Sequence, residues 1–97
     1  MTEQADGDGP YELIVASSAS YALSEVLPEG AAWAVIEFIN GRLLDNPHRL
    51  GAPLHGALEG LYSAHVDDYR VVYDIDDEAR TVEVVRVARR ADIYGIT

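Results

Sequence analysis

The stretch of sequence that decides the fold is Leu58–Tyr94, LEGLYSAHVDDYRVVYDIDDEARTVEVVRVARRADIY. Its β-branched and aromatic residues fall into three runs separated by polar residues, which predicts three consecutive strands followed by a short helix or tail. The strands are expected at 58–64, 68–75 and 81–88. The last two are joined by Asp76–Arg80, a polar turn of the length found in β-hairpins. Because five of the seven arginines and His65 lie in this stretch, we expect the sheet to carry the functional site.

Alternation along the two clearest strands assigns their side chains to two faces of the sheet. The face expected to pack against the helices holds Tyr69, Val71, Tyr73, Ile75, Val85 and Val87. The opposite face is expected to hold Arg70, Val72, Asp74, Val82, Val84 and Arg86. If Val85 and Val87 are the valines that join the core, Arg70 and Arg86 share the opposite face, and Arg90 joins them if the last strand continues.

Before this stretch, the sequence predicts one strand and a helical hairpin. The apolar run 11–16 is typical of a strand at the edge or second position of the same sheet. Ser17 or Ser18 is expected to cap a helix that Pro28 ends, and a second helix is expected over 31–44. The link between them is short, so the two helices pack as antiparallel neighbours. Their buried faces are expected to hold Ala19, Ala22, Leu23, Val26, Leu27, Ala32, Val35, Ile36, Ile39 and Leu43.

The order of elements is then β-α-α-β-β-β. It predicts an α+β domain in which an antiparallel-dominated sheet packs on a helical hairpin. A chain of 97 residues has room for one such domain, which we expect to span 10–97. Residues 1–9 are acidic and glycine-rich and are expected to be a disordered leader. Residues 45–53 contain two prolines and a glycine and are expected to form a loop without a regular element.

Composition excludes several classes of protein. The chain has no cysteine, which excludes disulfides and thiolate metal sites and is typical of a reducing cytoplasm. No apolar run reaches the ~18 residues of a membrane span, and the N-terminus lacks the basic start of a signal peptide. The three histidines do not have the spacing of metal ligands, so no metal is expected. We therefore expect a cytoplasmic protein without membrane attachment.

The net charge of −10 constrains any role in binding nucleic acid. Seventeen acidic residues stand against seven arginines and no lysine, so the chain repels phosphate backbones at long range. Contact with a nucleic acid must therefore depend on a local cluster of arginines. Such a cluster is expected around Arg70, with Arg86 and Arg89 as candidates for contact with nucleic acid.

Several short motifs are informative together: Asn46–Gly51, Leu58–Gly60, Asp68–Tyr73, Arg89–Arg90 and Tyr94. With the order of elements, they resemble the RelE/ParE toxin superfamily of bacterial type II toxin–antitoxin systems, and within it the RelE branch. The most specific piece is Tyr-Arg-Val-Val-Tyr at 69–73, which follows a Leu-Glu-Gly strand start. The resemblance covers 11–94 and implies the RelE-like fold.

The resemblance also implies a function. RelE-like toxins inhibit translation as ribosome-dependent endonucleases that cut mRNA in the ribosomal A site. They use no metal or other cofactor: the 2′-hydroxyl of the RNA attacks the adjacent phosphate, and basic side chains on the sheet serve as base, acid and charge stabiliser. The implied partners are the ribosome with its mRNA and a cognate antitoxin, whose disordered segment folds on the toxin. For so acidic a chain, we expect an antitoxin that is less acidic than usual, or one that binds through apolar contacts along Val72, Val82 and Val84.

Matched residue by residue, the resemblance implies four catalytic positions. Arg70 matches the sheet arginine that contacts the scissile phosphate, and Arg90 matches a second arginine near the chain end. Tyr94 matches a tyrosine that stacks on a base or assists the chemistry. His65 stands where the family usually has arginine or lysine, and a histidine can act as a general base at neutral pH.

The chain departs from the family pattern beside these positions. Leu61 and Ser63 stand where active members often carry lysines, and Asp67 replaces a common glycine. Two other functions are therefore open at this point: a catalytically weakened homologue that binds its antitoxin and takes part in autoregulation, or a ParE-like inhibitor of DNA gyrase. For the single residues, Arg70 could instead form a cross-strand ion pair with Asp74, and His65 could be a polar turn residue.

Overall fold

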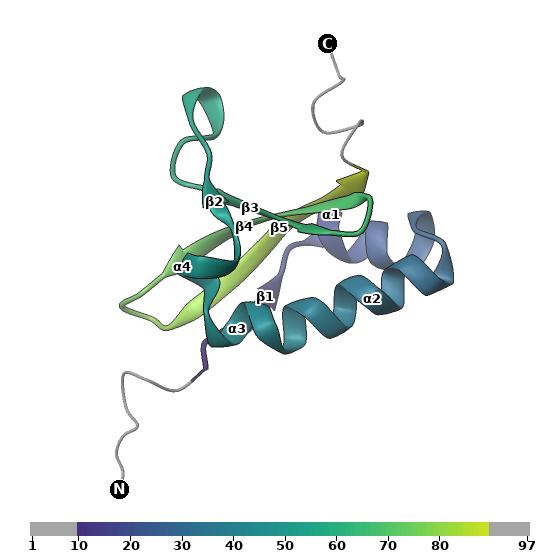
Figure 1. The fold of residues 1–97 in the computed structure, drawn as a ribbon, viewed down its shortest axis with the longest axis horizontal. Helices are drawn as coiled ribbons and strands as arrows, with labels where there is room; N and C mark the ends of the chain where they lie inside the picture. The colour runs from purple at the N-terminus through teal and green to yellow at the C-terminus, as the bar shows by residue number, and fades with distance from the viewer. Residues whose placement is uncertain (1–9, 90–97) are drawn as a thin grey trace, which may run out of the picture.

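The computed structural model of the protein describes residues 10–89, so the expected leader 1–9 and the expected catalytic residues Arg90 and Tyr94 lie outside the described residues. The described chain forms one five-stranded sheet in the order β1-β5-β4-β3-β2. The strands are β1 (Glu12–Val15), β2 (Ala52–Pro53), β3 (Tyr62–Val66), β4 (Tyr69–Asp76) and β5 (Thr81–Arg89). β1 pairs parallel with β5, and the other pairs are antiparallel. This mostly antiparallel sheet confirms the predicted fold class (Figure 1).

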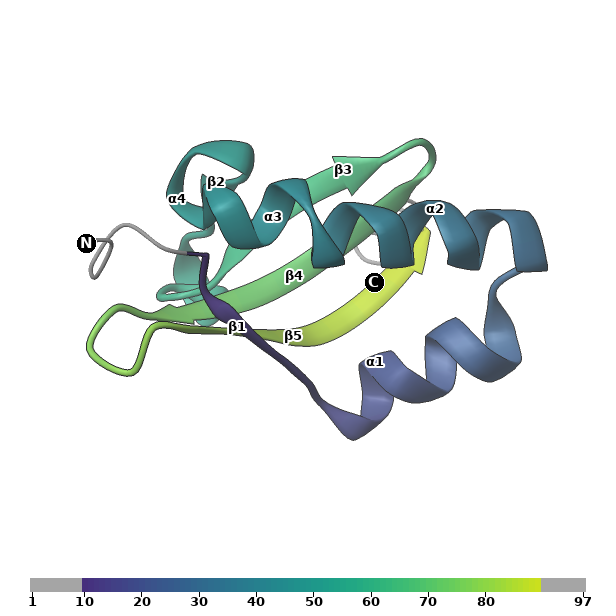
Figure 2. The same cartoon turned by 90° about the horizontal axis from the view of Figure 1, so that it is seen from below.

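The helical hairpin packs on one side of the sheet, as the two perpendicular views show (Figure 1, Figure 2). The helical segments are α1 (Ser17–Tyr21), the π-helical turn η2 (Ala22–Val26), α2 (Glu29–Asn40), α3 (Arg42–Asp45), α4 (Pro47–Leu50) and the 3-10 turn η3 (Gly56–Leu58). The loop that joins β2 to β3 and contains η3 rises from the other side of the sheet (Figure 1). The face opposite the helices is therefore bordered by a loop, and this face carries Arg70.

The second helix and the segment after it differ from their prediction. Gly41 leaves the helical region (φ −118°, ψ −94°), so α2 ends just before it instead of continuing to 44. The segment 45–53 contains the single-turn helix α4 and the short strand β2, although its prolines and glycine predict a loop. Pro47 is compatible with α4 because it lies in the first turn, where a backbone N–H has no helical partner. The strand expected at 58–64 begins only at Tyr62, after the η3 turn.

The first helix is capped and packed differently from its prediction. Its N-cap is Ala16, and the hydroxyl of Ser18 donates a hydrogen bond of 2.7 Å to the carbonyl of Val85 instead of capping the helix. The backbone N–H of Leu27 bonds the carbonyl five residues earlier. Because this π-helical turn adds a residue to the helical turn, Val26 is 61% exposed instead of joining the buried face.

A β-bulge in β5 changes which valines face the helices. In the pairing with β4, Arg86 lies opposite Val72 but Val84 lies opposite Tyr73, so Val85 is an extra residue. An extra residue resets the alternation of side chains between the two faces of a strand. The valines before and after the bulge therefore share the core face.

The predicted faces of β5 were wrong for three valines. Val82 and Val84 are fully buried in the core instead of facing away from it, and Val85 is half-buried at the bulge. Arg86 lies on the opposite face, as predicted. Since Val82 and Val84 are buried and Val72 is only 3% exposed, these side chains do not form a surface that an antitoxin can contact.

Tyr73 closes the core at the α4 end of the sheet. Its side chain is fully buried and stacks on Tyr62, with 5.7 Å between ring centroids, and its hydroxyl donates a 2.6 Å hydrogen bond to the carbonyl of Pro47. Burial is the main reason that the pKa of Tyr73 rises to about 12, so the phenol stays protonated and keeps this bond. The chain after α4 approaches β3 closely because Gly51 has no side chain: a Cβ there would lie 2.7 Å from the carbonyl oxygen of Ser63.

A polar network ties the turn between β4 and β5 to α4 and to Tyr11, the residue before β1. The carboxylate of Asp77 accepts hydrogen bonds from the hydroxyl of Tyr11 at 2.6 Å and from Nε2 of His48 at 3.0 Å. Because a carboxylate has no proton to donate, His48 carries its hydrogen on Nε2. These two hydrogen bonds hold the pKa of Asp77 below its ordinary value, and the bond from Tyr11 has the larger effect. The guanidinium of Arg80 lies over the Tyr11 ring, 4.1 Å from its centroid.

Asp77→Asn is expected to lower the melting temperature at neutral pH and to lose this effect in acid. A carboxyl whose pKa is lowered by folding stabilises the protein above its unfolded pKa, and this stabilisation disappears as the pH falls through the lower folded pKa. Thermal melts of wild type and variant between pH 7 and strong acid measure the difference. Asp74→Asn, at an exposed position of β4 shortly before this turn, is the control. A difference between wild type and Asp77→Asn that is independent of pH would contradict the assignment.

Candidate functional site

Three of the predicted site residues meet on the face of the sheet opposite the helices. Cross-strand pairing places His65 of β3 beside Arg70 of β4. Arg86 of β5 lies opposite Val72, and Arg70 lies opposite Ala88, so the two arginines are diagonal neighbours on this face. The antiparallel pairing of β3, β4 and β5 thus gathers two cations and an imidazole from three strands.

The guanidinium of Arg70 is held on its β3 side by two hydrogen bonds. Nη1 donates to Oγ of Ser63 at 3.1 Å, and Nη2 bonds Nε2 of His65 at 2.6 Å. Arg70 is 8% exposed, so solvent competes little with these bonds and the orientation of the guanidinium is defined. Asp74, which the sequence offered as an alternative partner, is exposed and lies opposite Glu83.

The contact with Arg70 determines the protonation state of His65. An arginine side chain has donors and no acceptor, so Nε2 of His65 must present its lone pair to Nη2. In this arrangement the imidazole is neutral and carries its hydrogen on Nδ1. His65 is also exposed, so a ligand can reach it from solvent. A neutral, accessible imidazole is the form that acts as a general base.

A polar groove of about 510 Å³ opens beside His65. It lies between α2 and the turn from β3 to β4, and its charged lining residues include Glu37, Arg42 and Asp67. Asp67 has a left-handed backbone (φ 54°), the conformation that glycine adopts without strain and that aspartate also tolerates. The acid that stands in place of a common glycine is therefore compatible with this turn, and it adds a negative charge to the groove.

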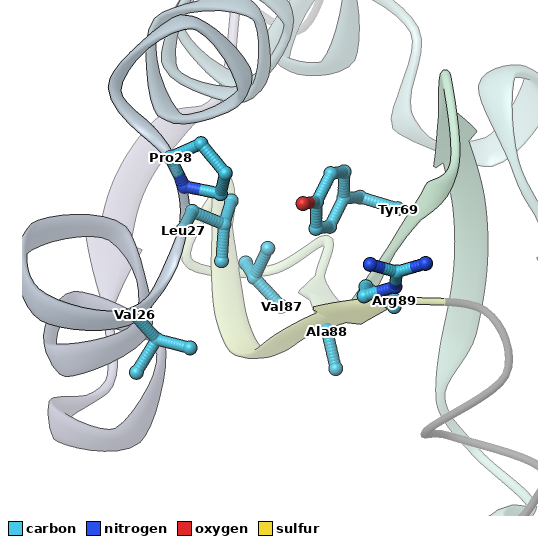
Figure 3. A pocket seen from close by; sticks show the side chains of 7 residues that line it. All are labelled: Val26, Leu27, Pro28, Tyr69, Val87, Ala88 and Arg89. Atoms are coloured by element: carbon cyan, nitrogen blue, oxygen red, sulfur yellow. The ribbon is translucent and has the colours of Figure 1, made fainter.

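Arg89 lies on the helix side of the sheet, because one step along a strand reverses the face. It is paired with Tyr69, and the two residues line a mainly apolar hollow of about 310 Å³ at the end of the helical hairpin (Figure 3). Leu27 and Pro28 form the opposite wall of this hollow (Figure 3). The structure therefore brings Arg86, but not Arg89, to the face that carries Arg70.

Sequence reasoning missed two residues of the site. Ser63 precedes His65 by two positions, so alternation alone could have placed its side chain beside Arg70. Arg42 had no comparable signal, since Arg42 and the end of β3 line the same groove only in the folded chain. Of the other predicted residues, Arg90 and Tyr94 lie outside the described residues.

Over 10–89, no helix has the length and apolar character that crossing a membrane requires. Within the same described residues, the histidines and carboxylates do not gather into a group of three or more that could hold a metal ion.

Comparison with known proteins finds similarity over most of the chain. Residues 30–94 match the family described as ParE toxin of type II toxin–antitoxin system, parDE. The chain is 51% identical over 87 residues to toxin RelE of Mycobacterium tuberculosis, which covers 90% of this chain and 89% of that protein. It is 44% identical over 85 residues to toxin RelG of the same species, which covers 88% of this chain and 97% of that protein.

A solved structure extends the likeness to three dimensions. A chain of the toxin–antitoxin complex RelBE2 from Mycobacterium tuberculosis matches with a TM-score of 0.80 and 40% sequence identity, over 84% of this chain and 100% of that chain. The RelE-type toxins are a family of ribosome-dependent mRNA endonucleases. Sequence identity, fold and motifs thus agree, and the chain belongs to the RelE/ParE family of toxins of type II toxin–antitoxin systems, in its RelE branch.

Proposed function

We propose that this protein inhibits translation by cutting mRNA on the ribosome, as an endoribonuclease that needs no metal or other cofactor. The observation that carries the proposal is the contact between the guanidinium of Arg70 and the imidazole of His65. Attack of a 2′-hydroxyl on the adjacent phosphate requires a base for its proton and a cation for the charge that develops. The two side chains have these properties, and both project from the hairpin formed by β3 and β4.

Arg70 is the charge stabiliser in this proposal. The transition state carries more negative charge on the phosphate oxygens than the bound RNA, and a guanidinium can donate to two of these oxygens at once. Arg86 is exposed on the same face and offers a second cation to the RNA backbone. The ribosome positions the mRNA and supplies much of the binding, so the net charge of −10 does not prevent contact with RNA.

His65 is the general base. In the free protein its Nε2 lone pair accepts a hydrogen from Nη2 of Arg70. A phosphate oxygen is anionic and a stronger acceptor, so the arrival of the RNA draws Nη2 away and makes the lone pair available. His65 then removes the proton of the 2′-hydroxyl while the oxygen attacks phosphorus and the bond to the 5′-oxygen breaks. The leaving 5′-oxygen must gain a proton. Of the two remaining residues that the resemblance implies, Tyr94 has a hydroxyl that can donate one, whereas Arg90 can only stabilise charge; both lie outside the described residues.

A cognate antitoxin is the regulator that we propose for this toxin. The similar Mycobacterium tuberculosis structure was solved as a toxin–antitoxin complex. Three large apolar side chains of the helical hairpin, Tyr21, Val26 and Trp33, are 60–62% exposed, and an antitoxin that binds the hairpin would bury them. We therefore expect the antitoxin's apolar contacts on the hairpin instead of on the buried valines of the sheet. With the ribosome as its target, the toxin acts in the cytoplasm.

His65→Asn is expected to lower the rate of cleavage at pH 7 by about 100-fold or more, because asparagine is polar but cannot take up a proton. Primer extension on a defined mRNA bound to programmed ribosomes measures the rate and the position of the cuts, which are expected in the A-site codon. His55→Asn makes the same change at an exposed position in the loop between β2 and β3 and should cut like wild type. Equal cutting by His65→Asn and wild type would contradict the role of His65.

The same assay tests the proposed function as a whole. Folded wild-type protein that makes no cuts on programmed ribosomes would show that the endonuclease assignment is wrong. A supercoiling assay with purified DNA gyrase would then test the ParE-like alternative. Inactivity in both assays, together with tight antitoxin binding, would indicate the weakened homologue.

A further inference from the structure

Ser63 is a buried polar residue in the middle of the candidate site. It is 7% exposed, and its Oγ accepts the 3.1 Å hydrogen bond from Nη1 of Arg70. Its backbone is paired on both sides, with Val72 of β4 and with Ala52 of β2. Ser63 is therefore held by the sheet and presents almost no surface to RNA, so any effect on catalysis must pass through Arg70.

We propose that Ser63 is a positioning residue that anchors Nη1 of Arg70 while Nη2 changes its partner from His65 to the phosphate. The inference rests on the proposed endonuclease function. A bond that does not change during this exchange limits the movement of the guanidinium, because the arginine side chain is long and has several rotatable bonds. The bond to Ser63 keeps the charge stabiliser beside the base.

The chemistry of a hydroxyl suits this task. Oγ of Ser63 is neutral, so it orients the guanidinium without compensating the positive charge that the phosphate requires. A carboxylate at this position would pair with Arg70 and weaken its attraction for RNA. A lysine, which active members of the family often carry here, would contribute its own charge but could not accept the bond from Nη1. This chain therefore uses position 63 to orient Arg70 instead of to add a second cation.

Ser63→Ala is expected to lower kcat for cleavage on programmed ribosomes by roughly 10-fold to 100-fold, the effect of losing one hydrogen bond to a charged group. KM is expected to stay within about twofold, since the lost interaction acts on the transition state. Ser63→Thr keeps the hydroxyl in a strand, where a β-branched residue is accommodated, and should restore most of kcat. Ser24→Ala, which removes a hydroxyl bonded one helical turn back on the hairpin, is the matched control and should cut like wild type.

A second measurement reads the orientation of Arg70 without any cleavage. In NMR spectra of arginine-labelled protein, the two Nη resonances of Arg70 are expected to be separate in wild type, because both nitrogens are hydrogen-bonded. In Ser63→Ala they are expected to average, and in Ser63→Thr to separate again. Thermal melting of each variant shows that it is folded under the conditions of the assay.

The two measurements distinguish failure of this inference from failure of the proposed function. An unchanged kcat for Ser63→Ala, with a wild type that cuts, would overturn the role of Ser63. A lower kcat with unchanged Nη resonances would also overturn it, because the effect would not pass through Arg70. If wild type makes no cuts, the endonuclease assignment fails, and the resonances alone decide whether Ser63 orients Arg70.

Discussion

Arg70→Ala is expected to lower the rate of mRNA cleavage on the ribosome by about 1000-fold, as the removal of a donor aimed at developing charge does in other enzymes. The substitution deletes a nearly buried guanidinium that Ser63 and His65 hold in place. Because the phosphate gains negative charge only as the 2′-oxygen attacks, the guanidinium stabilises the transition state more than the bound RNA. The loss should therefore appear in kcat, measured from A-site cuts at saturating ribosome concentration.

Two companion variants show whether geometry or charge is responsible. Arg70→Lys keeps the positive charge but presents a single ammonium, which cannot make the two-pronged contact, so it should recover no more than about 10-fold of the loss. Arg49→Ala removes one positive charge at an exposed position of α4 and should cut like wild type. A comparable loss in Arg49→Ala would assign the effect to the overall charge of the protein and contradict the role of Arg70.

Gly51→Ala is expected to produce the largest loss of stability among these variants. The backbone of Gly51 is extended (φ −122°, ψ −174°), so its conformation does not require glycine. Glycine is required here because there is no space for a side chain. The added Cβ would lie 2.7 Å from the carbonyl oxygen of Ser63, 3.0 Å from its carbonyl carbon, and against the hydroxyl of Tyr73. Overpacking of this kind costs about 1–3 kcal/mol, and each kcal/mol lowers the melting temperature of a domain of this size by roughly 4–8 °C.

The control for Gly51→Ala is the same substitution at Gly30, which lies in the first turn of α2 and has no atom within 4 Å of an added Cβ. There alanine should raise the melting temperature, because glycine in a helix is less favourable than alanine by roughly 0.5–1 kcal/mol. Opposite signs for the two variants would confirm that crowding after α4 is the cause. A melting temperature of Gly51→Ala equal to that of wild type would contradict the close approach to β3, the strand that carries Ser63 and His65.

Local patterns in the sequence were sufficient for the order and type of the main elements. The runs of β-branched residues at 68–75 and 81–88 became β4 and β5 with bounds that differ by one residue. The apolar stripe of the second helix also holds, with Ala32, Val35 and Ile39 buried. Both signals depend on residues that are close in the chain, where period and propensity act directly.

The faces of β5 could not be predicted in the same way. The residue that carries the bulge, Val85, has no partner in β4, and its carbonyl accepts a hydrogen bond from Ser18 of the first helix. The residue at the bulge therefore contacts a segment that lies 67 residues away in the chain. The alternation of residues along β5 does not indicate this contact. Because the bulge reverses the alternation of faces along β5, Val82 and Val84 are buried in the core. The pairing of Arg89 with Tyr69 places Arg89 on the face opposite to Arg70.

By itself, the sequence determined the α+β class, the family and the two residues on which the proposed chemistry depends, Arg70 and His65. These follow from periodicity and from short motifs, which need no knowledge of the partners in space. Only the tertiary structure decided that Ser63 and His65 hold the two ends of one guanidinium, and that Arg89 faces the helices. The physical reason is register: a hydrogen bond between strands needs pairing correct to a single residue, and one extra residue turns the following side chains to the other face.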